Sequence, residues 1–157
     1  MFLAIGLVLP FFTGQIPQIG KMLLPMHIPV FLCSLVCGWK YGAIVGFILP
    51  IMRSMLFSMP IMFPTAVAMA FELFTYGVVI GILYERSNKK GIKDVYIPLI
   101  IAMIAGRCVW GIVTCVVLGV KTDFLAVAVL NGIPGIILQL ILIPTVFSLI
   151  KAHQGEK

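Results

Sequence analysis

The sequence contains few charged residues. Asp, Glu, Lys and Arg make up 10% of the 157 residues, whereas soluble domains typically contain about 25%. Hydrophobic residues account for 62% of the chain, and its mean hydropathy is +1.19. Because so little charge cannot cover a water-facing surface, the composition excludes a soluble domain and indicates an integral membrane protein.

The common signatures of enzymes are also missing. The chain has no Gly-x-Ser-x-Gly, no His-Glu-x-x-His and no Walker sequence. Its only histidines are His27 and His153, the latter in the polar tail. An intramembrane protease would need a histidine or paired carboxylates inside the spans. The sequence therefore predicts a protein that is not an enzyme and cannot by itself couple transport to ATP.

The four cysteines do not form a metal or redox motif. There is no Cys-x-x-Cys, and all four lie inside apolar segments, at Cys33, Cys37, Cys108 and Cys115. We interpret them as small buried hydrophobic residues. No metal and no cofactor is predicted.

Long apolar segments dominate the chain. A spanning helix needs roughly 20 apolar residues, and continuous segments that do not alternate in period two favour helices over a barrel. The predicted fold is an all-α integral membrane protein, a six-transmembrane-helix bundle forming a single membrane domain over residues 1–157. The six segments cover residues 1–12, 28–38, 41–59, 66–84, 95–120 and 125–150.

Several segments depart from a regular span. Residues 1–12 would measure only about 18 Å as a helix and lack the features of a signal peptide; we expect the start of this helix to precede Met1. Residues 13–27 are rich in Gly, Pro and Gln, which opposes a regular helix. Pro50 interrupts the third segment, Pro98 lies in the first turn of the fifth, and Pro60 and Pro64 mark a loop.

The positive charges predict the orientation. With six crossings, the basic residues of 39–40, 85–94 and the C-terminal tail lie on one side of the membrane, and the other side has only Lys21 and Lys121. The positive-inside rule then places both termini in the cytoplasm, with irregular loops outside. The net charge of +6 is thus explained by topology and lipid headgroups, without nucleic acid.

Small residues recur at a spacing of four, in the pairs Gly42/Gly46, Gly77/Gly81 and Ala102/Gly106. Such pairs let helix backbones approach closely in a bilayer. They indicate packing within this chain or a docking face for another membrane subunit, and packing is the favoured interpretation.

Three ionisable residues lie well inside spans: Arg53, Glu72 and Arg107. A charge at the centre of a span costs about 2.5 to 3.5 kcal/mol even on the lenient insertion scale. Glu72 lies about 9 Å from the outer end of its helix, Arg107 near mid-membrane, and Arg53 at a compatible depth. All three can reach one zone in the outer half of the bundle, where Arg107 is the favoured partner of Glu72.

Other polar and aromatic residues can join this zone. They are Asn131 and Gln139 of the sixth segment, Trp110, Tyr76, and His27 and Lys21 of the outer loop. Two arginines and one glutamate leave a formal excess of +1, which favours an anionic ligand. The alternatives are a Glu72–Arg107 pair that only locks two helices, an Arg53 that extends to the headgroups, and a solvated His27 and Lys21.

The order of motifs resembles a known family. GLVLPFFTGQIPQIGKMLLPMHIPVFLCSLVCGWKYGAIVGFILP, MFPTAVAMAFELFTYGVVIGILYER, AGRCVWG and NGIPGIILQLILIP together resemble the substrate-binding S-component of energy-coupling factor (ECF) vitamin transporters. The resemblance covers nearly the whole chain. It implies six helices, residence in the bacterial cytoplasmic membrane, and a water-soluble vitamin as ligand.

The resemblance also implies partners and a mechanism. An S-component captures its vitamin near the outer face, under lids that would here be residues 13–27 and about 58–65. It docks on a membrane scaffold subunit carrying two ATP-binding cassette ATPases, and topples in the membrane to deliver the ligand. The family commonly docks through Ala-x-x-x-Ala on its first helix, and Ala4 with Val8 matches this pattern only in part.

The PMHIP segment most resembles the pantothenate branch; folate, cobalamin, riboflavin and niacin are the alternatives. In this hypothesis Arg53 and Arg107 hold the anion, and Glu72 orients Arg107 or accepts ligand hydroxyls. Asn131 and Gln139 bind the polar body of the ligand, Trp110 and Tyr76 line its apolar parts, and His27 covers the site. The competing hypothesis is a structural or assembly protein whose charges only lock its helices.

Overall fold

The structure, a computed structural model, describes residues 1–12, 26–58, 60–87, 93–119 and 122–155, without the side chains of 12, 93, 118, 122–134 and 153–155. Across these ranges the chain is helical and contains no strand. Six α-helices and one π-helical turn follow one another. They are α1 (Phe2–Phe12), α3 (His27–Cys37), α4 (Trp39–Phe57), η1 (Met62–Ala66), α5 (Val67–Arg86), α6 (Lys93–Leu118) and α7 (Thr122–Gly155).

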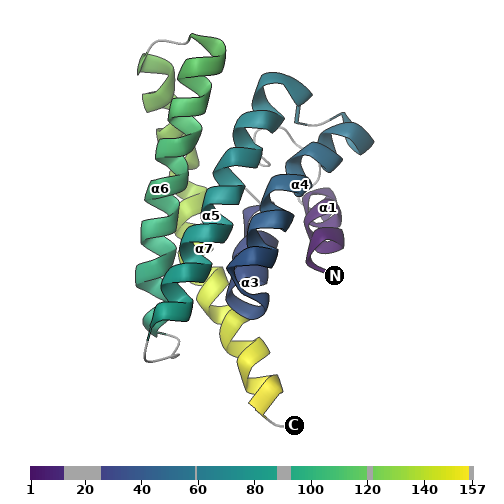
Figure 1. The fold of residues 1–157 in the computed structure, drawn as a ribbon, viewed down its shortest axis with the longest axis vertical. Coiled ribbons are helices and arrows are strands. Elements are labelled where there is room, and N and C mark those ends of the chain that lie inside the picture. Colours follow the sequence, from purple (N-terminus) through teal and green to yellow (C-terminus); the bar gives the residue numbers. More distant parts are fainter. Residues whose placement is uncertain (13–25, 59, 88–92, 120–121, 156–157) are drawn as a thin grey trace.

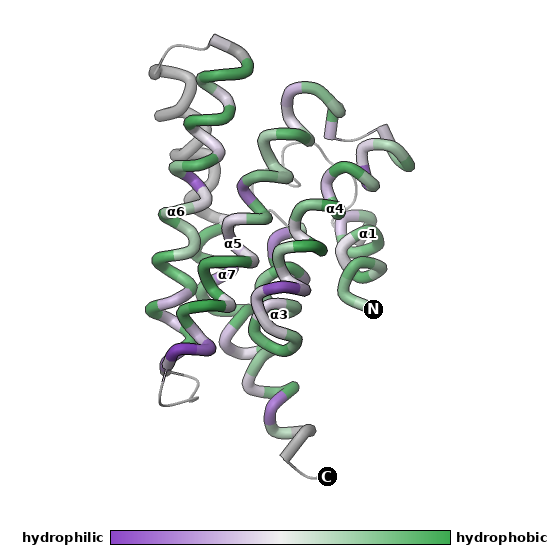
Figure 2. Tube along the Cα trace, viewed as in Figure 1, coloured by the Kyte–Doolittle hydropathy of each residue, from purple (hydrophilic) through white to green (hydrophobic). Residues whose placement is uncertain are grey.

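The six predicted segments are confirmed as the six α-helices. Within the described ranges, four stretches are long and apolar enough to cross a membrane: 39–57, 62–86, 94–117 and 135–152. The helices of residues 2–11 and 27–37 are apolar but shorter. Figure 2 shows hydrophobic residues along most of each helix, as expected for surfaces in contact with lipid.

Helix α5 occupies the middle of the bundle. It packs against α3, α4 and α6, while α7 contacts α6 and α3. In Figure 1 the end of α5, the start of α6 and the end of α7 lie at the lower end, and η1 lies toward the upper end. A polar side chain on the buried side of α5 is therefore placed to meet partners from several helices.

Glycines bring α4 and α5 close together. A Cβ atom added to Gly77 would lie 2.5 Å from the backbone of Gly42, and one added to Gly46 would strike the backbone of Leu73. Gly81 faces Trp39 in the same way. Between α5 and α6, Gly106 packs on the ring of Tyr76. The predicted small-residue pairs thus pack within the chain.

The prolines disturb the helices less than expected. Pro50 lies inside α4, which continues through it from Trp39 to Phe57, so the predicted interruption is wrong. Pro98 lies in the second turn of α6, because that helix already begins at Lys93. A missing N–H removes one hydrogen bond, and packing between neighbouring helices can hold a helix together across it.

The prediction of buried cysteines holds only for Cys33. Cys37 and Cys108 are exposed on the surface of the bundle, and Cys115 is half-buried. In a membrane protein an apolar thiol can face lipid as readily as protein, so an apolar segment does not predict burial inside the chain.

Candidate functional site

Glu72 lies in the second turn of α5 and is only 1% exposed. Three side chains converge on its Oε1 atom. The Tyr76 hydroxyl donates a hydrogen bond of 2.6 Å, an Arg107 terminal nitrogen lies at 3.3 Å, and His27 Nε2 lies at 3.8 Å. These four residues are the Glu72 cluster, and the predicted Glu72–Arg107 contact is confirmed.

Local sequence explains how the cluster forms. Tyr76 follows Glu72 by four residues, which places both on one face of α5. Gly106 lets α6 approach the Tyr76 ring, and the next residue, Arg107, then reaches the carboxylate. The Tyr76 ring is also held from α3, with ring centroids 5.3 Å from His27 and 5.0 Å from Phe31.

His27 is not a solvated loop residue. It is the first residue of α3 and is 1% exposed, so the solvated interpretation is wrong for this residue. Pro29 follows in the first helical turn, where its fixed φ suits a helix start. Helix α3 thus brings an imidazole to the same carboxylate that Tyr76 and Arg107 contact.

Several buried polar atoms of the bundle have no hydrogen-bond partner among the described residues. They are both ring nitrogens of His27, Nε of Arg107, Nε2 of Gln139 and Oγ1 of Thr114. A buried polar group without a partner costs about 1 to 3 kcal/mol. Such groups are retained where a ligand or water completes them, and most of these atoms can donate a hydrogen bond.

Arg53 has a different environment from the one expected. It is 8% exposed, and its guanidinium donates a 3.1 Å hydrogen bond to the carbonyl oxygen of Leu7. The same group lies 5.7 Å from the ring centre of Phe11 and 5.8 Å from that of Phe57. Arg53 therefore tethers α1 to α4.

The family model for the substrate-specific component of ECF transporters matches residues 1–147. The chain belongs to this family. A search of curated proteins and a search of solved structures each found no match. The family explains the apolar helices, because its members are membrane-embedded transporter subunits that bind a small substrate and associate with scaffold and ATPase subunits.

The other predicted site residues of this S-component are located only by their helix and their burial. Gln139 of α7 is buried at 2% exposure, and Trp110 of α6 is half-buried. Asn131 lies in α7, but its side chain is outside the described residues, as is Lys21. The structure thus brings together His27, Glu72, Tyr76 and Arg107, and it gives Arg53 other contacts.

Of the two predicted lids, the structure describes most of the second and only the end of the first. Residues 13–25 lie outside the described residues. In the second lid, Ser58 ends α4 with a left-handed backbone (φ 55°). Met62–Ala66 then form the π-helical turn η1, whose packing partners are α4, α5 and α6. This segment is therefore irregular, as predicted.

Sequence reasoning missed Thr114. It is 2% exposed and lies two turns along α6 from Arg107. A spacing of seven places both side chains on the same face of a helix, so the spacing itself was the available signal.

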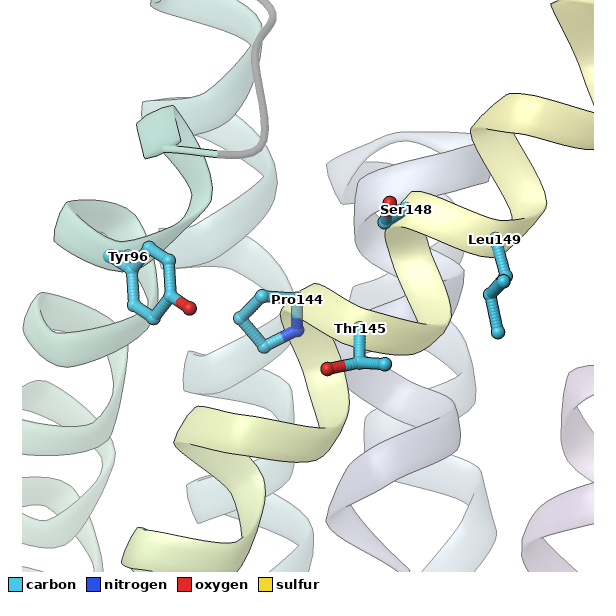
Figure 3. A pocket seen from close by; sticks show the side chains of 5 residues that line it. All are labelled: Tyr96, Pro144, Thr145, Ser148 and Leu149. Atoms are coloured by element: carbon cyan, nitrogen blue, oxygen red, sulfur yellow. The ribbon is translucent and has the colours of Figure 1, made fainter.

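A separate hollow lies between α6 and α7 (Figure 3). It is lined by Tyr96, Pro144, Thr145, Ser148 and Leu149. None of the predicted site residues lines it, and the Thr145 hydroxyl already donates to the Ile141 carbonyl at 2.6 Å. The Glu72 cluster remains the better candidate for substrate binding.

Proposed function

We propose that this S-component captures an anionic water-soluble vitamin at the Glu72 cluster, with pantothenate favoured over folate, cobalamin, riboflavin and niacin. The observation that carries the proposal is a buried carboxylate surrounded by donors, of which Arg107 Nε has no partner among the described residues. A guanidinium with an open N–H recognises carboxylates well.

The roles within the site follow from position. Arg107 contacts the ligand carboxylate, while Glu72 holds the guanidinium and accepts ligand hydroxyls. Gln139 and Asn131 hydrogen-bond the polar body, and Trp110 and Tyr76 cover its apolar parts. His27 closes the site at the start of α3. Arg53 can bind the anion only if its guanidinium gives up the hydrogen bond to the Leu7 carbonyl. Its alternative role is to tether α1 to α4.

Delivery requires the partner subunits of the family. The chain docks on the membrane scaffold with its two ATP-binding cassette ATPases and topples to carry the vitamin inward. Ala4 and Val8 are both exposed on α1, which supports this helix as the docking element. Both termini lie in the cytoplasm of the bacterial cell.

Titration calorimetry against a panel of vitamins tests the proposal. We expect tight binding of one anionic vitamin by the purified chain alone. Arg107→Ala should weaken that binding by at least about 30-fold, because a desolvated charge contact typically costs 2 to 5 kcal/mol to remove. Lys151→Ala, at an exposed position, is the matched control and should change the affinity little.

The Glu72–Arg107 contact also supports the rival function, a structural protein whose charges only lock α5 to α6. That function requires Arg107→Ala to lower the melting temperature while no vitamin raises it. Equal effects of Arg107→Ala and Lys151→Ala on vitamin affinity would exclude the proposed binding site at the Glu72 cluster.

A further inference from the structure

The Glu72 cluster contains one negative and one fixed positive charge. Glu72 and Arg107 balance each other across 3.3 Å, so the cluster is neutral while His27 carries a single ring proton. The sequence alone suggested an excess of +1, but that count included Arg53. In the structure Arg53 is occupied by the Leu7 carbonyl and two aromatic rings.

The groups that surround His27 come from several helices. Glu72 and Tyr76 face it from α5, and Arg107 reaches the same carboxylate oxygen from α6. Helix α1 carries no ionisable side chain, and the ionisable side chain near the outer end of α4 is Arg53. In the described part of α7, Gln139 is buried and neutral, and Lys151 is exposed.

An anion that enters this neutral cluster adds an uncompensated negative charge beside Glu72 and His27, which are each only 1% exposed. Such a charge is costly unless a positive group appears beside it. Histidine is the side chain that gains a charge between pH 8 and pH 5. Both His27 ring nitrogens are buried without a hydrogen-bond partner among the described residues, so a protonated ring can donate to Glu72 and to the ligand.

We infer that this site binds its anionic ligand together with one proton, which His27 accepts. The inference rests on the proposed function, since it requires an anion at the Glu72 cluster. The overall reaction is balanced: one anion and one solvent proton enter, and the cluster returns to zero net charge.

Linkage fixes the direction of the pH dependence. When binding takes up a proton, affinity rises as the pH falls, by at most tenfold per pH unit for one proton. The increase ends once His27 is already protonated in the free protein. We therefore expect affinity for pantothenate to be about 10-fold or more higher at pH 6 than at pH 8.

Calorimetry measures the proton directly. Full-length protein in detergent is titrated with pantothenate at pH 8 in phosphate and in Tris, whose ionisation enthalpies differ. The dependence of the observed heat on the buffer gives the number of protons taken up, and we expect a value close to one. This measurement on the unaltered chain does not depend on whether any variant folds.

Three variants test whether His27 is the residue that accepts the proton. His27→Gln should bind with no proton uptake and with an affinity that does not change between pH 6 and pH 8. Glu72→Gln leaves Arg107 uncompensated, so the anion should again bind without a proton. Lys151→Ala is the matched control and should keep the full uptake.

The possible outcomes separate the two proposals. Tight pantothenate binding without proton uptake and without pH dependence would overturn the inference and leave the proposed function intact. Uptake that persists in His27→Gln would also overturn it, because Glu72 would then be the acceptor. Absence of binding by pantothenate and by every other anionic vitamin would overturn the proposed function and the inference with it.

Discussion

At the scale of single residues, one carboxylate oxygen organises the site. Glu72 Oε1 is approached by a phenol, a guanidinium and an imidazole, each from a different direction. The phenol makes the shortest contact, at 2.6 Å. Tyr76 therefore supports the carboxylate that in turn positions Arg107, and its hydroxyl is the group whose removal tests this support.

We expect Tyr76→Phe to destabilise the protein by about 1 to 3 kcal/mol, because the carboxylate loses a buried hydrogen bond. For a chain of this size each kcal/mol corresponds to roughly 2 to 4 °C in Tm. Thermal unfolding followed by fluorescence measures the change. Tyr41→Phe, at a residue that is 63% exposed, is the control, and an equal loss in both variants would contradict the supporting role.

Depth along a helix could be predicted from the sequence, but direction around the helix could not. The rise per residue placed Glu72 and Arg107 within reach of one zone, and their contact confirms it. Arg53 was placed at a similar depth by the same arithmetic, yet its side chain faces α1. When every face of a helix is apolar, its composition does not show which face points to the binding site. That face depends on the packing angles between the helices.

At the scale of helices, α5 approaches α4 by close backbone contact at glycines. Gly77 lies against Gly42, and the Ser34 hydroxyl donates a 2.9 Å hydrogen bond to the Gly77 carbonyl. The same helix presents Glu72 and Tyr76 to the site. A change in the spacing between α4 and α5 therefore moves the carboxylate relative to His27 and Arg107.

Gly77→Ala tests this coupling. The new methyl group would meet the backbone of Gly42 at 2.5 Å, which cannot rotate away, and overpacking typically costs about 1 to 3 kcal/mol. We expect a lower Tm and weaker vitamin binding in the same variant. Val116→Ile also adds one methyl group, at a residue that is 78% exposed, and should change neither measurement.

Helix positions were predictable because apolar segments and polar turns alternate clearly along the chain. The third segment shows the limit of that signal, since Pro50 indicated a break that α4 does not have. The start of α3 shows the same limit, because His27 was assigned to a loop and is helical. In both cases neighbouring helices, which a local pattern cannot include, decide the outcome.

At the scale of the whole molecule, the two ends of the bundle differ in charge. Figure 1 shows the start of α4, the end of α5 and the last turns of α7 at one end of the bundle. These segments carry Lys40, Arg86 and Lys151. Glu85 of the same end accepts a 3.3 Å hydrogen bond from the backbone N–H of Trp39. This end has the excess of Lys and Arg that is characteristic of cytoplasmic loops.

We expect a green fluorescent protein fused after Lys157 to fluoresce in intact bacteria, because that protein matures in the cytoplasm. Alkaline phosphatase fused at the same point should be inactive, since it folds only after export. The charge bias provides the physical reason, as Lys and Arg near span ends resist translocation. The matched control carries the same reporters at residues 60–61, between α4 and η1, where the activities should be reversed. Active phosphatase at Lys157 would contradict the orientation, and would place the start of α5, which carries Glu72, on the cytoplasmic side, where an importer could not load its substrate.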